Sequence, residues 1–514
     1  MPSVPKNIAK PQIRALGWPV FLLLAVSYVY AFPYFDRLRS ANEMPRLLQT
    51  QEFVDKGHFW LDERRGDMTS QFDTSFGPDG KQYPNKAPGP SFLAMPVYVV
   101  AKLFGMKSIA AFTWAFRVFA VTLPALLFLP FFYRLTSRFT DDEDARRTAL
   151  FAYALGSPAL VYGVLFMSHQ LAAVCAGAAF VAAVPLVRDD VERPQWRAAA
   201  VGFFAAAAVM MDYQSALASL WVGVYLLAFA PGRLRNLAFA AAGAAPIVLL
   251  LAIYHQVCFG SPLRTGYHFS VDQVTRKGFM GTVGPSAQSF FSTTFLPANG
   301  LFVLAPWFLF AFVGAAAIVS SAELRARVGK EALICAAIFG TYLLFLSSLD
   351  PYMARGGWCV GPRYLVVSLP FAAWLACAGF TATFTRPALR IVSLASVVVG
   401  VIVYVSAITT YPHWPERLAN PLYELAFRLL RSDRSVHSLG HRFGLHGATA
   451  ALPLFALAAA ALAWLFSRRR QGGWKTALGA FAVGAAVVGA YSLFPASGPY
   501  AEQAWNFVIS TWEP

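Results

Sequence analysis

Long apolar runs alternate with short polar turns along almost the whole chain. The runs recur at roughly 20 residues, the length that an α-helix needs to cross a hydrocarbon core of about 30 Å. The pattern predicts an all-α protein, a polytopic bundle of about 13 transmembrane helices with a margin of one or two. We expect these helices to form a single integral membrane domain over 1–514.

Three longer polar segments interrupt this pattern, and we predict outer loops at 36–107, 257–297 and 412–447. Within the first loop, 90–104 is apolar, but at about 15 residues it is short for a membrane span. We therefore expect a helix that lies in the outer membrane interface at this point. The third loop predicts a second interfacial helix, because its apolar residues follow helical spacing at Leu422, Leu425 and Leu429.

Composition and charge support a membrane protein. Of the 514 residues, 57% are hydrophobic and only 13% are charged, about half the roughly 25% of soluble domains. The net charge of +16 is concentrated at alternate turns, of which Arg468–Arg470 is the most basic. The positive-inside bias places these turns and the N-terminus in the cytoplasm. The basic excess is then an orientation signal, and its spread over separate turns makes nucleic acid an unexpected partner.

Charged residues are few within the apolar runs, and polar residues collect at the predicted outer ends and in the outer loops. An ion or proton pathway would favour carboxylates near the membrane midplane. A site at the outer interface instead suits an enzyme whose substrate has a lipid tail and a polar head. Because His, Cys and Asp do not cluster as in a zinc site, we expect no required cofactor. A divalent cation held by carboxylates and a phosphate stays an open alternative.

The first outer loop is the densest polar segment. It contains Asn42-Glu43 followed by Arg46, and it closes with Lys86-Ala87-Pro88-Gly89. A carboxylate here could take a proton from an acceptor hydroxyl, while Lys or Arg could neutralise a phosphate. For each residue the plain alternative is a solvated loop charge, and Asp79-Gly80 is typical of a turn.

This arrangement resembles that of GT-C-type glycosyltransferases, polytopic enzymes that include protein O-mannosyltransferases and the lipid A aminoarabinose transferases. The resemblance covers about residues 15 to 380 and is closer still to uncharacterised bacterial GT-C-like proteins. It also rests on further motifs at outer helix ends, namely Phe166–His169, Cys258–Pro262, Gly300–Phe302 and Gly356–Tyr364.

The resemblance implies an inverting glycosyltransferase of a bacterial inner membrane, with its site facing the outside. The implied donor is a polyprenyl-phosphate-linked sugar, and the acceptor is a hydroxyl of a lipid, glycan or protein, among the membrane lipids. The related enzymes carry an Asp-Glu pair where this chain has Asn42-Glu43. Because Asn cannot act as a base, the implied base is Glu43, with Asp73 as the alternative.

Phosphate ligands are also implied. Lys86 matches a lysine that approaches the lipid phosphate in the aminoarabinose transferases, and Arg363 and Arg46 are further candidates. For Arg363 an interfacial anchor is the competing interpretation. Candidate substrate contacts are Asn42, His169, Asp212, Tyr213, Tyr267 and His268, for which backbone bonding, helix capping or loop solvation are equally open.

Two other function classes stay open. A multi-pass transporter or lipid flippase would show inverted repeats and functional charges near the midplane. A non-catalytic assembly factor with a GT-C-like fold is also compatible with the chain, because Asn42 departs from the enzymes' pattern.

Overall fold

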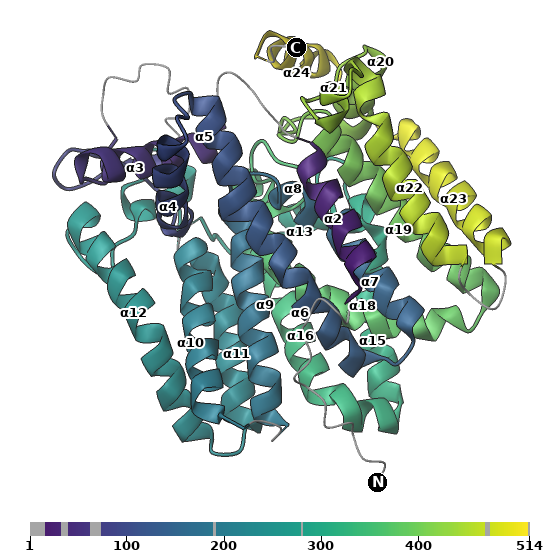
Figure 1. The fold of residues 1–514 in the computed structure, drawn as a ribbon, viewed down its shortest axis with the longest axis horizontal. Helices are drawn as coiled ribbons and strands as arrows, with labels where there is room; N and C mark the ends of the chain where they lie inside the picture. Colours follow the sequence, from purple (N-terminus) through teal and green to yellow (C-terminus); the bar gives the residue numbers. More distant parts are fainter. Residues whose placement is uncertain are drawn as a thin grey trace.

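The computed structural model describes residues 16–31, 40–61, 73–188, 192–278, 281–467 and 473–511. The basic run Arg468–Arg470 and part of the predicted first outer loop lie outside these ranges. Within the described residues the chain forms a helical membrane bundle, with most of its long helices running side by side (Figure 1).

The bundle helices are joined mostly by short turns. They are α2 (Trp18–Tyr30), α5 (Ile109–Ala115), α6 (Leu123–Phe139), α7 (Glu143–Leu155), α8 (Pro158–Tyr162), α9 (Ser168–Val187), α10 (Pro194–Met211), α11 (Ala216–Phe229), α12 (Arg233–Phe259), α15 (Leu309–Ser320), α16 (Ala322–Ser348), α18 (Leu369–Phe384), α19 (Pro387–Thr409), α22 (Leu452–Ser467) and α23 (Gly473–Ala490). A π-helical turn, η2 (Phe116–Thr122), joins α5 to α6, so these three elements form one continuous rod.

Among the described residues, 8 helices are long and apolar enough to cross a membrane. Four shorter apolar helices accompany them, including α2 and the segment Tyr213–Phe229. The apolar stretch at about 148–187, for which the sequence predicts two spans, forms α7, α8 and α9. The chain is therefore a polytopic membrane protein, whereas the number of 13 spans stays a prediction.

Glycines allow neighbouring helices to approach closely. A Cβ at Gly202 of α10 would overlap the backbone carbonyl of Ala240 in α12, and one at Gly243 would overlap that of Ala199. Small residues serve membrane helices in this way because lipid tails provide no hydrophobic force between helices. The remaining surface of α12 is largely apolar and exposed, as expected for a helix that faces lipid: Val248, Leu249, Ile253 and Val257.

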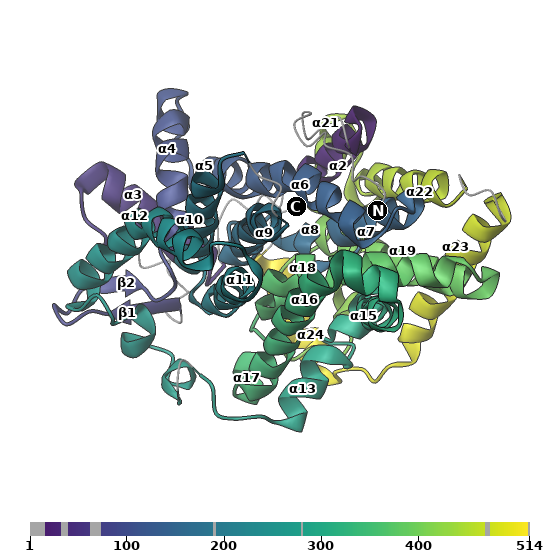
Figure 2. The same ribbon diagram turned by 90° about the horizontal axis from the view of Figure 1, so that it is seen from below.

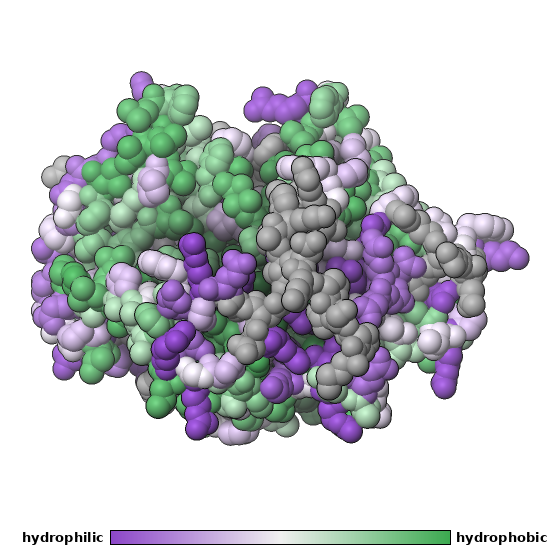
Figure 3. All heavy atoms as spheres, turned by 60° about the horizontal axis from the view of Figure 1, so that its bottom comes forward, coloured by the Kyte–Doolittle hydropathy of each residue, from purple (hydrophilic) through white to green (hydrophobic). Residues whose placement is uncertain are grey.

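Ion pairs join helices at one end of the bundle. We call it the turn end, because short turns follow α6, α9 and α11 there and a short turn precedes α16. Glu331 of α16 accepts hydrogen bonds from Arg188 Nε (2.8 Å) and from Tyr225 Oη (2.6 Å). Arg327 pairs with Asp141. Figure 3 brings this end forward and shows hydrophilic side chains gathered on it beside a broad hydrophobic flank.

The opposite end, the loop end, carries shorter elements: α3 (Glu43–Lys56), α4 (Gly89–Leu103), α20 (Phe427–Arg431), α21 (Leu439–Arg442) and α24 (Pro499–Thr511). Helices α3 and α4 cross the ends of the long helices rather than run along them (Figure 1 and Figure 2). The C-terminal tip of α4 exposes Leu103 and Phe104, whose exposed fractions are 81% and 82%. Such a helix fits a membrane interface.

One element at the loop end is not helical. Strands β1 (Thr74–Phe76) and β2 (Gln82–Pro84) form an antiparallel hairpin in which Ser75 faces Tyr83. Its turn contains Asp79-Gly80, where Gly80 has a φ of 76° and Asp79 accepts a hydrogen bond from the Lys81 amide. The strands are too short to produce a hydropathy pattern, so the sequence did not predict them.

Candidate active site

The hairpin brings a carboxylate and an amine together. Asp73 directly precedes β1, and Asn85 and Lys86 directly follow β2, so all three lie at the open end of the hairpin. The Asn85 amide donates a hydrogen bond to the Asp73 carbonyl (3.1 Å). Lys86 Nζ then lies 3.1 Å from Asp73 Oδ1. The register of two short strands thus determines this ion pair.

Two glycines let other segments approach the hairpin end. A Cβ at Gly89 would lie 2.6 Å from the carbonyl oxygen of Met210, so the start of α4 touches the end of α10, where Asp212 follows. A Cβ at Gly266 would lie 2.6 Å from the Cα of Asn85. The second loop therefore packs directly on the hairpin and places Tyr267 against Lys86, whose Nζ lies 5.1 Å from the ring centroid.

These segments enclose a small polar cavity at the loop end, which we call the first pocket. Its volume is about 10 Å³, room for about one water molecule. The beginning of α9 contributes one wall, and the positive end of that helix favours an anion there. The lining residues are Asn42, Arg46, Lys86, Ala87, Ser168, His169, Asp212, Tyr267, Arg363 and Tyr364.

Positive charge exceeds negative charge at the first pocket. Lys86 is paired with Asp73. Arg46 donates to the backbone oxygen of Asn42 (2.9 Å) and to its side-chain oxygen. Arg363 donates to the Tyr364 hydroxyl (3.0 Å). Among the described residues no carboxylate forms an ion pair with either arginine, and the Nε of each is buried without a hydrogen-bond partner. The pocket is suited to an anion with several oxygen atoms.

Lys86 and Asp73 stabilise each other's charged forms. Burial opposes ionisation of Lys86, but the Asp73 carboxylate raises the pKa of the amine well above its usual value. Burial also opposes ionisation of Asp73, yet Lys86 and Arg363 hold the pKa of the carboxyl below its usual value. Asp73 is therefore ionised and Lys86 protonated at neutral pH.

Glu43 does not line the first pocket. Its side chain is fully buried, and its two carboxylate oxygens accept hydrogen bonds from Arg117 Nε (2.9 Å) and Nη2 (2.7 Å). The backbone amide of Phe166 donates a further hydrogen bond (2.7 Å), and His413 Nε2 lies 3.5 Å away. The carboxylate joins α3 to η2 and to the segment before α9.

This environment makes Glu43 a poor proton acceptor. Although burial opposes its ionisation, Arg117 and His413 hold the pKa of Glu43 far below its usual value. A base has to lie within hydrogen-bond reach of the proton that it takes, and the acceptor positions of Glu43 are already occupied by Arg117 and Phe166. Of the two sequence-based candidates, Asp73 contacts Lys86 and Asn42 of the first pocket, whereas Glu43 contacts only groups outside it.

The structure divides the other candidate residues into two groups. His169 and Asp212 face each other in the first pocket, with His169 Nδ1 2.9 Å from Asp212 Oδ2. Tyr213 lies outside it and shares a hydrogen bond of 2.8 Å with His255. His268 also lies outside it and contacts Thr265 at the start of a short 3₁₀ turn.

Sequence reasoning missed several residues of this region. Arg117 lies within the apolar run 110–133, where the sequence predicts a membrane span. A lone arginine in such a run is itself a signal of a specific partner. Ser168 donates a hydrogen bond to Asp212 (3.2 Å) and accepts one from Arg46 (3.3 Å). His413 had no such signal, because it lies in a polar loop far along the chain from Glu43.

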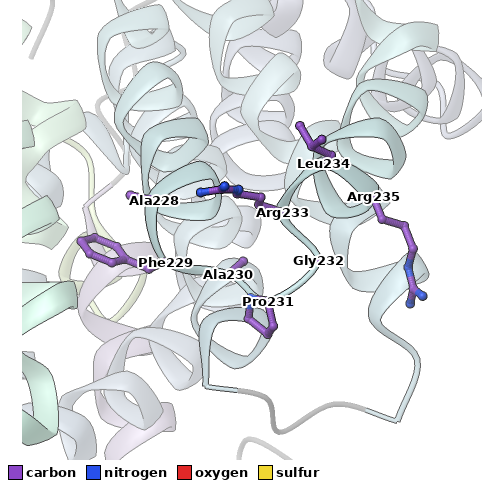
Figure 4. A pocket seen from close by; sticks show the side chains of 8 residues that line it. All are labelled: Ala228, Phe229, Ala230, Pro231, Gly232, Arg233, Leu234 and Arg235. Atoms are coloured by element: carbon purple, nitrogen blue, oxygen red, sulfur yellow. The ribbon is translucent and has the colours of Figure 1, made fainter.

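Another depression lies at the turn end, where residues 228–235 join α11 to α12. It is larger, about 620 Å³, but one stretch of chain provides its whole lining. Figure 4 shows that its two arginines, Arg233 and Arg235, point to different sides. Within the described parts of the chain, no group of three or more His, Cys, Asp or Glu residues could hold a metal ion.

No protein-family model matches the sequence, and the search of curated proteins found no match. Solved structures do resemble it. ArnT from Cupriavidus metallidurans is similar both in the apo state and bound to undecaprenyl phosphate, each with a TM-score of 0.50 and 16% identity over 93% of this chain and 78% of that protein.

The apo oligosaccharyltransferase of Archaeoglobus fulgidus is similar with a TM-score of 0.50 and 14% identity. The match covers 91% of this chain but only 59% of that protein. Such identities carry information about the fold alone, and they agree with the all-helical bundle described above. The chain has the fold of GT-C-type glycosyltransferases.

Proposed function

We propose that the protein is an inverting glycosyltransferase that uses a polyprenyl-phosphate-linked sugar at the outer face of a bacterial inner membrane. The observation that carries this proposal is the meeting of three cations, Lys86, Arg46 and Arg363, with two carboxylates, Asp73 and Asp212, which leaves an excess of positive charge. A phosphate would supply the missing negative charge. The ArnT structure bound to undecaprenyl phosphate gives this interpretation a precedent within the same fold.

The location supports a lipid-borne donor. The first pocket lies beside the start of α4, and the opposite end of this helix exposes Leu103 and Phe104, which fit the membrane interface. A lipid phosphate can therefore reach the three cations while its chain stays in the membrane. Because the cavity holds only about one water molecule in this structure, donor binding requires the lining side chains to move apart.

In the proposed reaction the acceptor hydroxyl oxygen attacks the anomeric carbon of the donor sugar. The new bond joins that oxygen to the carbon, and the bond from the carbon to the phosphate oxygen breaks. Asp73 accepts the hydroxyl proton, and the electron pair leaves with the polyprenyl phosphate. Lys86, Arg46 and Arg363 stabilise the charge that develops on the departing phosphate.

Asn42 helps to hold Asp73 in its ionised form. Its amide nitrogen donates to Asp73 Oδ2 (3.3 Å), while its carbonyl oxygen accepts from Arg46. An aspartate at this position would place a second negative charge beside Asp73. Where the related enzymes have an aspartate at the position of Asn42, this chain therefore has a carboxylate nearby on the hairpin, that of Asp73.

The test compares Asp73→Asn with Asp141→Asn in protein purified into lipid nanodiscs. Asp141 is a matched control because it is an exposed aspartate at the turn end. Release of sugar from undecaprenyl-phosphate donors is measured with and without a mixture of lipid and glycan acceptors. We expect Asp73→Asn to lower transfer by about 10²–10⁴-fold and Asp141→Asn to retain it. Full activity of Asp73→Asn would exclude Asp73 as the base.

Donor binding separates the enzyme from a transporter. Lys86→Gln should weaken binding of undecaprenyl phosphate, whereas the transporter alternative predicts movement of the lipid across vesicles without sugar release. If the lipid phosphate binds equally well to wild type and Lys86→Gln, the assignment of the first pocket is wrong.

A further inference from the structure

A second pocket of about 270 Å³ lies near the first one, close to the lower limit of roughly 300 Å³ for small-molecule sites. Three segments and Pro495 form it. The segments are the end of α13 (Ala287–Thr294) with the residues that follow, the turn at 355–359 and the loop at 414–419. Most of its lining comes from loops, and the proposed donor site uses none of these residues.

Two buried polar groups of this second pocket have no partner. Trp414 is 1% exposed and its indole Nε1 makes no hydrogen bond. Asn299 is 5% exposed, and its amide nitrogen donates to the Arg355 carbonyl (2.9 Å) while its Oδ1 has no partner. Buried polar groups in proteins are normally hydrogen-bonded, so each exception calls for an explanation, and an absent water or ion is one of them. The wall of the pocket therefore contains one donor and one acceptor without a partner.

Three charged side chains surround the same space. Arg355, Arg417 and Glu416 all line the pocket, and none of them forms an ion pair with another described residue. Burial raises the pKa of Glu416 despite the neighbouring charges of Arg417 and Arg355. The arginines favour an anionic group, whereas the Glu416 carboxyl and Asn299 Oδ1 favour hydroxyl donors. Together these preferences describe a hydroxylated ring that also carries an acid.

One stretch of chain separates the two pockets. Gly357 and Cys359 line the second pocket, whereas Arg363 lines the first. The Cys359 amide donates to the Trp414 carbonyl (3.0 Å), and a Cβ at Gly356 would lie 3.2 Å from the Arg363 side chain. The turn is therefore packed against both sites, and a molecule in the second pocket would lie next to the donor phosphate.

We propose that the second pocket binds the acceptor, and that the acceptor carries an acidic sugar headgroup, a hydroxylated ring bearing a carboxylate or a phosphate. That the ligand is the acceptor rests on the proposed function. The class of ligand rests only on the residues that line the second pocket. The ring hydroxyls donate to Asn299 and Glu416, a ring oxygen accepts from Trp414, and the acid pairs with the arginines.

The test is ligand binding to the full chain in nanodiscs, followed by saturation-transfer NMR. Glucose, glucuronate, glucose 1-phosphate and inorganic phosphate are titrated separately. We expect glucuronate or glucose 1-phosphate to bind at least tenfold more tightly than glucose, and the tighter of the two identifies the acid as carboxylate or phosphate. If glucose equals both acids, or if inorganic phosphate equals glucose 1-phosphate, the proposed ligand class is wrong.

Variants place the ligand in the pocket. Arg417→Gln and Trp414→Phe should each raise the dissociation constant about tenfold. Arg417 is exposed, so its replacement leaves the packed interior intact. Arg431→Gln and Trp196→Phe are controls at exposed sites outside the pocket. Equal binding by all four variants would overturn the proposal.

Lys86→Gln distinguishes this inference from the proposed function. It should leave binding of the acidic sugar unchanged while it weakens binding of undecaprenyl phosphate. Loss of acidic-sugar binding in Arg417→Gln with normal lipid-phosphate binding supports the second pocket. Normal acidic-sugar binding in Arg417→Gln refutes it, whatever happens to the donor.

Discussion

Replacing Glu43 by Gln tests whether this residue supports the fold or the chemistry. The substitution keeps the shape of the side chain but removes its charge. It leaves the Arg117 guanidinium buried without a carboxylate. The side-chain amide nitrogen of the new Gln would face either Nε or Nη2 of Arg117, both of which donate to Glu43 in the wild type. Removing one partner of a buried ion pair costs about 3–5 kcal/mol because the other charge stays uncompensated.

A cost of this size is a large part of the roughly 5–15 kcal/mol that stabilises a typical folded domain. The matched control is Glu502→Gln. Glu502 makes the same two-bond contact with Arg428, at 2.8 and 2.9 Å, but on the exposed surface. We therefore expect Glu43→Gln to unfold at a clearly lower denaturant concentration and Glu502→Gln to unfold like wild type.

The assay is denaturant unfolding in mixed micelles, followed by tryptophan fluorescence. The double variant Glu43→Gln/Arg117→Gln should recover part of the loss, because both charges are then removed. Wild-type unfolding of Glu43→Gln together with lost sugar transfer would refute the structural role and return Glu43 to the chemistry.

The same pair predicts how stability depends on pH. The pKa of Glu43 is lowered in the folded state, so its contribution is present above the unfolded value of about 4.3 and is lost as the pH falls below it. Wild type should therefore lose more stability than Glu43→Gln between about pH 5 and pH 3. Equal losses would contradict a stabilising ion pair between Glu43 and Arg117.

Three further predictions address the first pocket and the bundle. Lys86→Gln should move the acid limb of the kcat/KM profile to higher pH, because Lys86 lowers the pKa of Asp73. If the acid limb does not move, it reports the ionisation of a group other than Asp73. Asn42→Asp should lower transfer at neutral pH, because the new carboxylate would face Asp73 across the present 3.3 Å contact; a faster enzyme would contradict the proposed base. Gly202→Leu should destabilise the protein in the same unfolding assay, because its side chain would overlap Ala240, whereas Gly223→Leu has open space and should be tolerated.

Hydropathy was sufficient for the parts of the fold that depend on lipid. Apolar runs long enough to cross a membrane have few alternatives to a helix, because every backbone polar group has to be satisfied within the segment. The short helix α4 was also predictable from its length and apolar character, and the structure has it at Gly89–Leu103. The hairpin was not, because strands of 3 residues leave no periodic pattern.

The first pocket was predictable as a set of residues but not as a set of contacts. Lys86, Arg363, Asp212 and His169 could be singled out because polar residues at apolar helix ends are conspicuous. The choice between Glu43 and Asp73 could not be made from the chain, because it depends on an arginine 74 positions away from Glu43. Arg117 was visible in the sequence, but nothing local identified its partner.

The π-helical turn η2 has a consequence for how this membrane helix tolerates length changes. Before the turn, Phe112 packs against Tyr98 of α4; after it, Phe132 stacks on Trp374 of α18. A π turn contains one residue more than an α-helical turn, and one residue corresponds to a rotation of about 100°. Deleting a single residue within Phe116–Thr122 would restore a regular helix but turn its two halves out of phase. The rod would still be long enough for the membrane. It could no longer pack Phe112 against α4 and Phe132 against α18 at the same time.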